Sequence, residues 1–285
     1  MANSLPTNTI LSADKFADFR QKAAQLARYT HDFSPEIAVK GTGVTVWYQT
    51  STTASIWDTT NKFASADETV PNSTITVGEP YYKQFYLSPN EQASFGEEFL
   101  IKRSGPAVNA VLDEVKKQAQ VLLTAGAVPI AATVSASAMA FGAVLSGSNI
   151  LTNSGSTGPQ TLLASTNAYA ALITEAKNAN YAITSEVLDG QNSFKYALLP
   201  SITVVQEPSM TNSALMTPDA VAIALRQTVA MNGYNRNTVV DPVLNITIPL
   251  DIIEDPVGGV ILGRATISAA VGAGRPGSAV RYVHP

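Results

Sequence analysis

The sequence of 285 residues contains no cysteine and has few charged residues. Without cysteine, disulfides and thiolate-based zinc sites are excluded. Asp, Glu, Lys and Arg make up 14% of the chain, against about 25% in a typical soluble domain. Positions 118–174 form a run of 57 residues without Asp, Glu, Lys, Arg or His. Such a shortage favours a chain that buries surface against partners, because a free monomer normally relies on a charged surface. A secreted protein rich in Ser, Thr and Asn is the alternative that composition leaves open.

Signals for nucleic-acid recognition, secretion and membrane insertion are also missing. The net charge is −4 and no basic stripe occurs, so sequence-specific nucleic-acid binding is not predicted. The first 30 residues are polar and charged, and predict no signal peptide. The uncharged stretch 125–146 is rich in Ala and Ser and holds Pro129 and Gly142, which favours a surface or interface segment over a membrane helix.

Catalytic and metal-binding patterns are absent too. The two histidines, His31 and His284, lie near the chain ends without metal-ligand spacing. There is no phosphate-binding loop and no nucleophile elbow. Adjacent acids such as Asp113-Glu114 and Glu254-Asp255 are interpreted as solvated surface. We therefore predict no enzymatic activity, no metal and no cofactor. A hydrolase that depends on one of the two histidines remains as an alternative.

The N-terminal third predicts one helix followed by β-structure. Ser12 is expected to cap a helix whose apolar face is formed by Phe16, Phe19, Ala23 and Leu26. Strands are expected over 44–48, 74–77 and 81–87. They flank a long polar segment, 49–72, so we expect a long hairpin that projects from the body. Two aromatic residues in its tip, Trp57 and Phe63, pack locally or anchor the tip on a neighbouring copy.

The clearest element is a long helix predicted over 104–125. Ser104 is expected to cap it and Pro106 fits its first turn. At about 1.5 Å per residue this helix spans roughly 30 Å. Its apolar face is expected to consist of Val108, Val111, Leu112, Val115, Ala119, Leu122 and Leu123.

The second half alternates between helix and strand. A helix is predicted over 167–178, and another from Thr217 to about Gly233, where Met216 and Val221 would form a hydrophobic staple. Strands are predicted over 202–205, 244–250, 260–271 and 279–283.

This order of elements resembles the Hong Kong 97-type capsid fold, which tailed bacteriophages share with encapsulin shells. Ile202-Thr203-Val204-Val205, followed by Ala214-Leu215-Met216 and the helix predicted from Pro218, resembles the exit from that family's axial domain. The stretches 246–250, 267–272 and 275–281 resemble its closing strands.

The resemblance implies an α+β fold with five parts. They are an N-terminal arm (1–35), an E-loop hairpin (36–88), a peripheral domain (89–127) with a spine helix (104–125), an axial domain (128–230), and a return to the peripheral sheet (231–285).

The resemblance also implies a function. The chain would be the major capsid protein of a tailed bacteriophage, a structural subunit that self-assembles into pentamers and hexamers of an icosahedral shell around double-stranded DNA. It would be located in the virion and assembled in the host cytoplasm. Its partners would be further copies, a portal and separate scaffolding or decoration proteins, with DNA contacted non-specifically and no membrane. An encapsulin-type cargo shell and a surface adhesin-like β-protein remain alternatives.

The E-loop tip carries the implied contact residues Trp57, Lys62 and Phe63. Some members of the family crosslink an E-loop lysine to an asparagine on a neighbour. That chemistry would use Lys62 and an acceptor among Asn232, Asn235 and Asn237, whereas an ordinary solvated lysine is the default interpretation.

Overall fold

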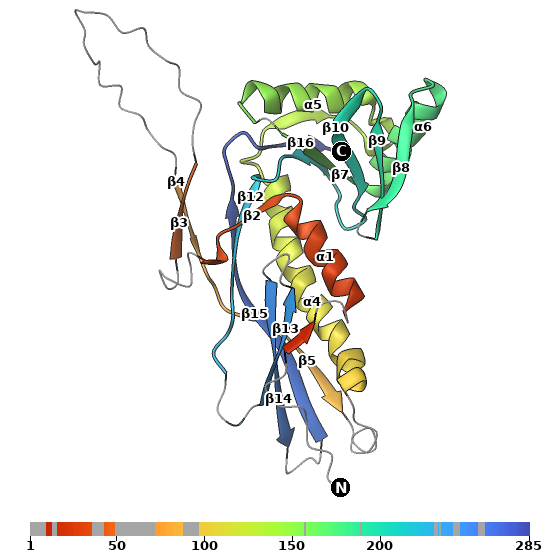
Figure 1. Ribbon diagram of the computed structural model, residues 1–285. Helices are drawn as coiled ribbons and strands as arrows, with labels where there is room; N and C mark the ends of the chain where they lie inside the picture. The colour runs from red at the N-terminus through yellow and green to blue at the C-terminus, as the bar shows by residue number, and fades with distance from the viewer. Residues whose placement is uncertain are drawn as a thin grey trace, which may run out of the picture.

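The computed structural model consists of two large sheets and one hairpin, with helices packed on the sheets (Figure 1). The described residues are 10–12, 16–35, 43–48, 72–87, 97–156, 158–188, 190–230, 233, 235–241, 246–255 and 260–285. We call the two sheets the lower and the upper sheet, after their positions in Figure 1.

The lower sheet has seven strands in the order β1-β13-β14-β15-β12-β2, and β5 also pairs with β15. Most neighbours are antiparallel, but β1 is parallel to β13 and β2 is parallel to β12. The bounds are β1 Ile10–Ser12, β2 Thr30–Asp32, β5 Tyr81–Leu87, β12 Val221–Arg226, β13 Asn235–Asp241, β14 Ile246–Asp255 and β15 Val260–Ala273.

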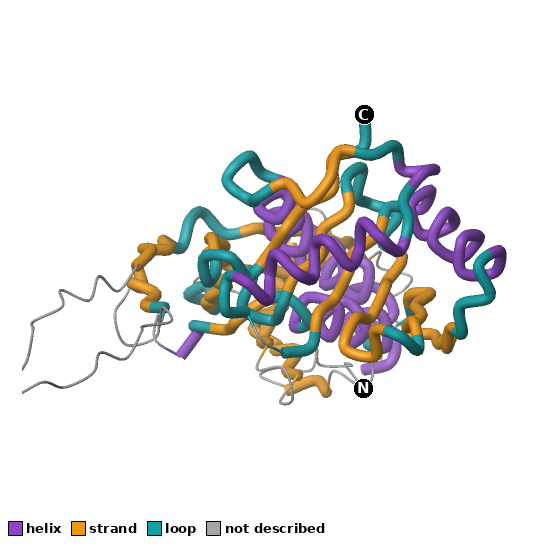
Figure 2. The backbone as a smooth tube through the Cα atoms, turned by 90° about the horizontal axis from the view of Figure 1, so that it is seen from above, coloured by secondary structure: helices purple, strands orange, loops and turns teal. Residues whose placement is uncertain are grey.

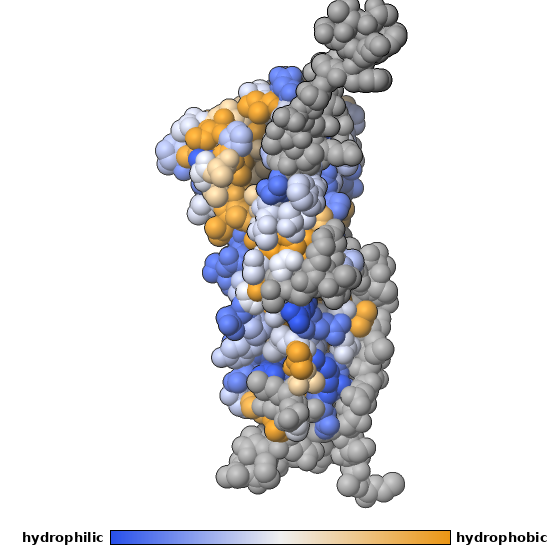
Figure 3. Space-filling view, turned by 90° about the vertical axis from the view of Figure 1, so that its left-hand side faces the viewer, coloured by the Kyte–Doolittle hydropathy of each residue, from blue (hydrophilic) through white to orange (hydrophobic). Residues whose placement is uncertain are grey.

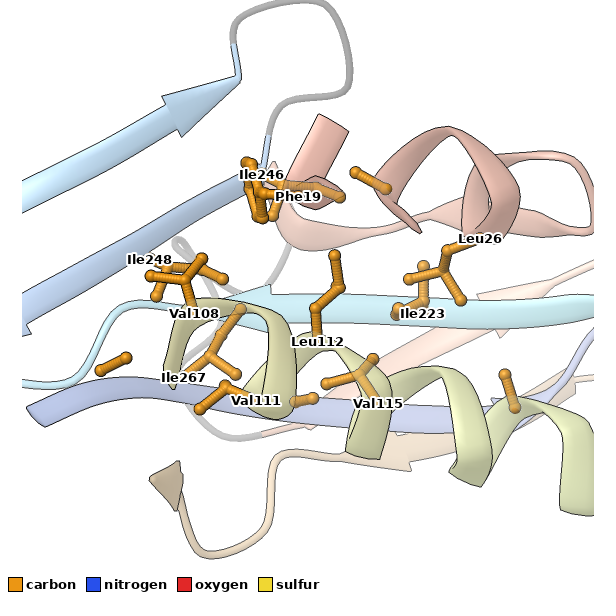
Figure 4. Packing of buried hydrophobic residues seen from close by; sticks show 14 of the residues in the cluster. Phe19, Leu26, Val108, Val111, Leu112, Val115, Ile223, Ile246, Ile248 and Ile267 are labelled. Carbon is orange, nitrogen blue, oxygen red and sulfur yellow. The ribbon is translucent and has the colours of Figure 1, made fainter. Parts of the chain in front are cut away.

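Two helices, α1 (Ala17–Ala27) and α4 (Glu97–Thr124), cover one face of the lower sheet. Figure 4 shows apolar side chains of α4 between those of α1 and those of the strands. Of the residues expected on the apolar face of the long helix, Val108, Val111, Leu112 and Val115 are buried in this core, and Leu122 packs against it half-buried. The core forms because the apolar stripe of α4 meets the inward-facing residues of the strands.

The opposite face of the lower sheet carries a hairpin, β3 (Gly43–Trp47) and β4 (Asn72–Thr76), paired in antiparallel register. Residues of β12 alternate between the two faces: Val221 and Ile223 point to the α4 core, whereas Ala222 and Ala224 contact the hairpin. The pairing confirms the expected hairpin arms, but β5 joins the lower sheet instead of extending the hairpin. The tip between the arms, 49–71, lies outside the described residues.

The upper sheet also has seven strands, in the order β6-β16-β11-β7-β10-β9-β8. Their bounds are β6 Ile130–Thr133, β7 Gln160–Ala164, β8 Ile183–Leu188, β9 Gln191–Tyr196, β10 Leu199–Gln206, β11 Ser213–Met216 and β16 Ala279–Val283. Helices α5 (Phe141–Asn153) and α6 (Thr166–Asn178) pack on it, together with the short 3-10 helix η2 (Ala136–Ala138). Seen from above, helices lie over its strands (Figure 2). A second hydrophobic core fills the space between them.

The chain passes between the two sheets at 125–129, 217–220 and 274–278. The last two crossings are joined by backbone hydrogen bonds: Gly274 N–H donates to Ala220 O (3.0 Å), and Thr217 N–H donates to Ser278 O (2.9 Å). Consequently the expected range 128–230 includes β12 of the lower sheet, and the expected range 231–285 includes β16 of the upper sheet.

The predicted helix from Thr217 to about Gly233 is wrong. Thr217–Ala220 form a turn, in which Ala220 N–H donates to Thr217 O (3.1 Å), and Val221–Arg226 form strand β12. This strand lies between β15 and β2, and its first four residues are buried. A strand covered on both faces has a continuous apolar run, which periodicity alone does not separate from a buried helix.

The predicted starts of the N-terminal helix and of the long helix are also wrong. Ser12 belongs to β1, and α1 begins at Ala17. The long helix begins at Glu97, so Pro106 lies inside it and not in its first turn. Proline has no N–H to donate one turn back, but here tertiary packing outweighs that loss. Helix α5 was not predicted, because its sequence has no charged face to mark it. The helix predicted over 167–178 and the strands predicted over 202–205, 260–271 and 279–283 are confirmed to within three residues at each end, whereas the strand predicted over 244–250 continues to Asp255 as β14.

Gly274→Ala is expected to destabilise the junction between the sheets by about 2 kcal/mol, through overpacking. An added Cβ would lie 2.1 Å from the Asp219 carbonyl oxygen and 2.5 Å from the Ala220 carbonyl carbon, which are backbone atoms that cannot rotate away. The measurement is urea unfolding followed by circular dichroism. Gly126→Ala is the matched control, since no atom lies within 4 Å of its added Cβ; equal stability of the two variants would contradict the prediction.

Candidate assembly surfaces

The residues expected at the E-loop tip lie outside the described part of the chain, as does Asn232. The other two candidate crosslink acceptors are in β13. Asn235 is exposed, whereas Asn237 is fully buried. Of these two, only Asn235 is therefore accessible to a group on another copy.

The two histidines have separate partners and do not lie in a common site. His31 Nδ1 lies 3.1 Å from Asp219 Oδ1 on the surface. His284 Nδ1 lies 2.8 Å from Val134 O, and its Nε2 lies 2.8 Å from Ser213 Oγ. Since a carbonyl only accepts, Nδ1 donates to it, and Nε2 is the acceptor for the Ser213 hydroxyl in the neutral ring.

Ser213 and His284 thus form a hydroxyl–imidazole pair that the sequence analysis did not find, because 71 residues separate them. The Ser213 side chain is fully buried, and its oxygen also accepts from the Ser165 N–H (3.2 Å). The Ser213 hydroxyl is thus enclosed within the chain, and the pair fixes the end of the chain on the upper sheet. Within the described ranges no group of three or more His, Cys, Asp or Glu side chains is placed to hold a metal ion.

An ionic cluster joins α4 to the upper sheet. Lys116 Nζ lies 2.6 Å from Glu207 Oε2; the Glu207 side chain is buried, and that of Lys116 is 12% exposed. Glu207 also accepts hydrogen bonds from Gln191 (2.7 Å) and Ser209 (2.6 Å), while Lys116 donates to Gln25 of α1 (2.8 Å). Burial by itself raises the pKa of the Glu207 carboxyl, but the Lys116 charge and these hydrogen bonds outweigh it and hold the pKa below its ordinary value.

A second cluster lies on the face of the lower sheet that α4 does not cover. Leu250 and Ile252 point into the core, so Asp251 between them points to the opposite face. Its carboxylate is fully buried beneath two arginines: Arg236 donates through Nε (2.7 Å) and Nη2 (2.9 Å), and Arg264 through Nη2 (3.1 Å). Charge-assisted, bidentate bonds of this kind hold β13, β14 and β15 in register.

Exposed apolar side chains are found on several separate elements. Two tyrosines of β5, Tyr82 and Tyr86, are more than half exposed, as is Trp47 at the end of β3. On the upper sheet the most exposed is Val187 of β8, at 73%, and Ile130 of β6 is 50% exposed. No helix in the described segments is long and apolar enough to cross a membrane.

Comparison with known proteins relies on structure alone. No protein-family model and no curated protein matches the sequence. The capsid structure of the cyanophage P-SCSP1u matches with a TM-score of 0.56 and 9% identity, over 100% of this chain and 90% of that chain. A chain of Mycobacterium phage Che8 matches with a TM-score of 0.53 and 13% identity, over 99% and 93%. The virus-like particle from Pyrococcus furiosus matches with a TM-score of 0.55 and 10% identity, over 94% and 97%.

The chain has the Hong Kong 97-type capsid fold. The match extends over nearly the whole chain and nearly the whole of each neighbour. The α+β class expected from the sequence is confirmed. The two ionic clusters described above join elements within one chain, whereas the exposed aromatic residues of β3 and β5 lie at its surface.

Lys116→Met is expected to destabilise the subunit by about 3 kcal/mol, because it leaves the Glu207 carboxylate buried without its partner. The double variant Lys116→Met/Glu207→Gln should lose less than the sum of the two single variants. Urea unfolding of all three variants measures this difference. Lys117→Met, one residue along on an exposed position, is the control and should stay close to the wild type.

Acidification is expected to weaken the same junction. Since the pKa of Glu207 is lowered by folding, the ionised carboxylate stabilises the folded state above its unfolded value of 4.5. That stabilisation is lost as the pH falls from there through the pKa of the folded state. The urea concentration at the unfolding midpoint of the wild type should therefore decrease as the pH falls below about 4.5. In Glu207→Gln this decrease should be smaller. A decline that is unchanged in Glu207→Gln, yet removed in the surface variant Glu114→Gln, would contradict this assignment.

Proposed function

We propose that the chain is the major capsid protein of a tailed bacteriophage, which assembles as pentamers and hexamers of a closed shell around double-stranded DNA. The observation that carries the proposal is the near-complete match, in both directions, to a cyanophage capsid chain. The low charge of the chain supports it, because subunits of a shell bury much of their surface.

The parts of the fold receive roles within this proposal. The lower sheet with α4 is the peripheral domain and its spine, and the upper sheet is the axial domain, made of about 129–216 and 279–285. The hairpin β3-β4 forms the arms of the E-loop. We assign its tip, with Trp57, Lys62 and Phe63, to contacts with a neighbouring copy, where aromatic side chains are effective anchors.

The proposal includes no catalysis. The role of each copy is to bind others, and many modest contacts repeated around a shell hold it closed through avidity. A net charge of −4 gives the chain no general attraction for DNA, so we propose that the enclosed DNA is contacted non-specifically. Portal, scaffolding and decoration proteins are further partners under this proposal, and assembly takes place in the host cytoplasm.

Electron microscopy and sedimentation of the protein purified from its native source test the proposal. Closed icosahedral particles, or rings of five and six copies, are expected, and nucleic acid should be recovered from the particles. A uniform monomer without particles would overturn the shell function. Particles filled with a cargo protein and free of nucleic acid would overturn the viral version in favour of an encapsulin-type shell.

A shortened hairpin tests the role of the E-loop tip. Trp47 pairs with Asn72 at the end of the arms, so an Asn-Gly turn in place of residues 49–70 keeps both strands in register. The expected result is a folded subunit by circular dichroism that does not close shells under conditions where the wild type does. Normal particles from this variant would contradict the assignment of the tip.

A further inference from the structure

The upper sheet is open at both ends. Its outermost strands are β8 and β6, and no described strand pairs with the outer side of either. In Figure 1, β8 lies at the right-hand end of this sheet, and β16, the neighbour of β6, lies towards the left. An unpaired edge presents a row of free backbone N–H and C=O groups to another strand.

The β8 edge is exposed and held in place. All four side chains from Thr184 to Val187 are exposed, so neither face of the strand is covered. Strand β8 pairs with β9 without a bulge, and the residue that starts β9, Gln191, is bonded to Glu207 and to Arg28. The hairpin is thereby fixed to the body of the subunit.

The β8 edge also lacks the features that usually block strand addition, which are proline, a bulge or an unpaired charge. Its one charged side chain, Glu186, is neutralised by Lys195 of β9 (3.4 Å). Val187, at 73% exposed, is the most exposed apolar side chain of the upper sheet. Such a strand is suited to pair with another chain.

The β6 edge has matching chemistry. The strand, Ile-Ala-Ala-Thr, carries no charge and lies in the uncharged run 118–174. Ile130 at its start is 50% exposed. Figure 3 views the molecule from the left-hand side of Figure 1, away from β8, and there hydrophobic surface gathers over the upper part of the molecule.

We propose that β8 of one copy adds to the β6 edge of the next copy, with Val187 packed near Ile130, so that the upper sheets form a continuous ring. A ring requires a head-to-tail contact whose two halves lie on different sides of the subunit, and the two ends of one sheet meet that requirement. Pairing of β8 with β8 would give an isolated dimer. This inference rests on the proposed shell function and names the strands that join neighbouring copies.

Cysteine crosslinking tests the pairing on a clean background, because the chain contains no cysteine of its own. Val187→Cys and Ile130→Cys proteins of different tag length are assembled together and treated with a short bismaleimide, which tolerates a small offset in register. Only mixed dimers are expected. The variant with both cysteines should give a ladder that ends at five and six copies. Homodimers of Val187→Cys alone, or an absence of mixed dimers in assembled material, would overturn the pairing.

Val187→Lys provides a second readout. A lysine at this exposed position should leave the urea midpoint unchanged but reduce the yield of rings or shells at least tenfold. Val229→Lys is the matched control, since that valine is 82% exposed and follows β12 of the lower sheet; its yield should equal that of the wild type. Normal assembly of Val187→Lys overturns the inference while the shell function stands. A wild type that forms no rings or shells overturns the shell function itself.

Discussion

Lys116 and Glu207 form a buried ion pair that ties α4, the helix at the centre of the lower core, to the far end of strand β10 in the upper sheet. At the other end of the same contact region, Arg281 of β16 donates to the carbonyls of Thr124 (3.0 Å) and Val128 (3.1 Å), where α4 terminates. Each interaction places a charge where water is scarce, so each is favourable only while its partner is in position. These contacts of α4 contribute to the relative placement of the two sheets, together with the three segments of the chain that cross between them.

The sequence was sufficient for those elements whose pattern is local. The apolar stripe of α4, the alternation in β14 and β15, and the glycine-rich approach to β16 each reflect contacts within one element. The predictions failed for elements whose structure depends on packing against residues distant in the sequence. Val221–Arg226 is a strand because it is covered on both faces by elements that are distant in the sequence, and α5 has no charged residue that would mark a solvent-facing side. The fold brings together two pairs whose members are distant in the sequence, Ser213 with His284 and Lys116 with Glu207. No spacing in the sequence predicts these pairs.

The likeness to capsid chains with 9–13% identity shows how little of this fold depends on particular side chains. What is preserved is the fold, over nearly the whole of each chain. The polar clusters described above join the parts of this chain to one another. The hydroxyl–imidazole pair of Ser213 and His284 fixes the end of the chain on the upper sheet.

Three described segments, 125–129, 217–220 and 274–278, cross between the lower and upper sheets, and two of them are hydrogen-bonded to each other. Three parallel connections of the backbone resist separation of the two sheets more strongly than a single connection would. A tensile load applied to one sheet is divided among the three connections, and the backbone hydrogen bonds between 217–220 and 274–278 must break before these two connections can extend. Under the proposed shell function, pressure from within would therefore be shared by three connections in each subunit.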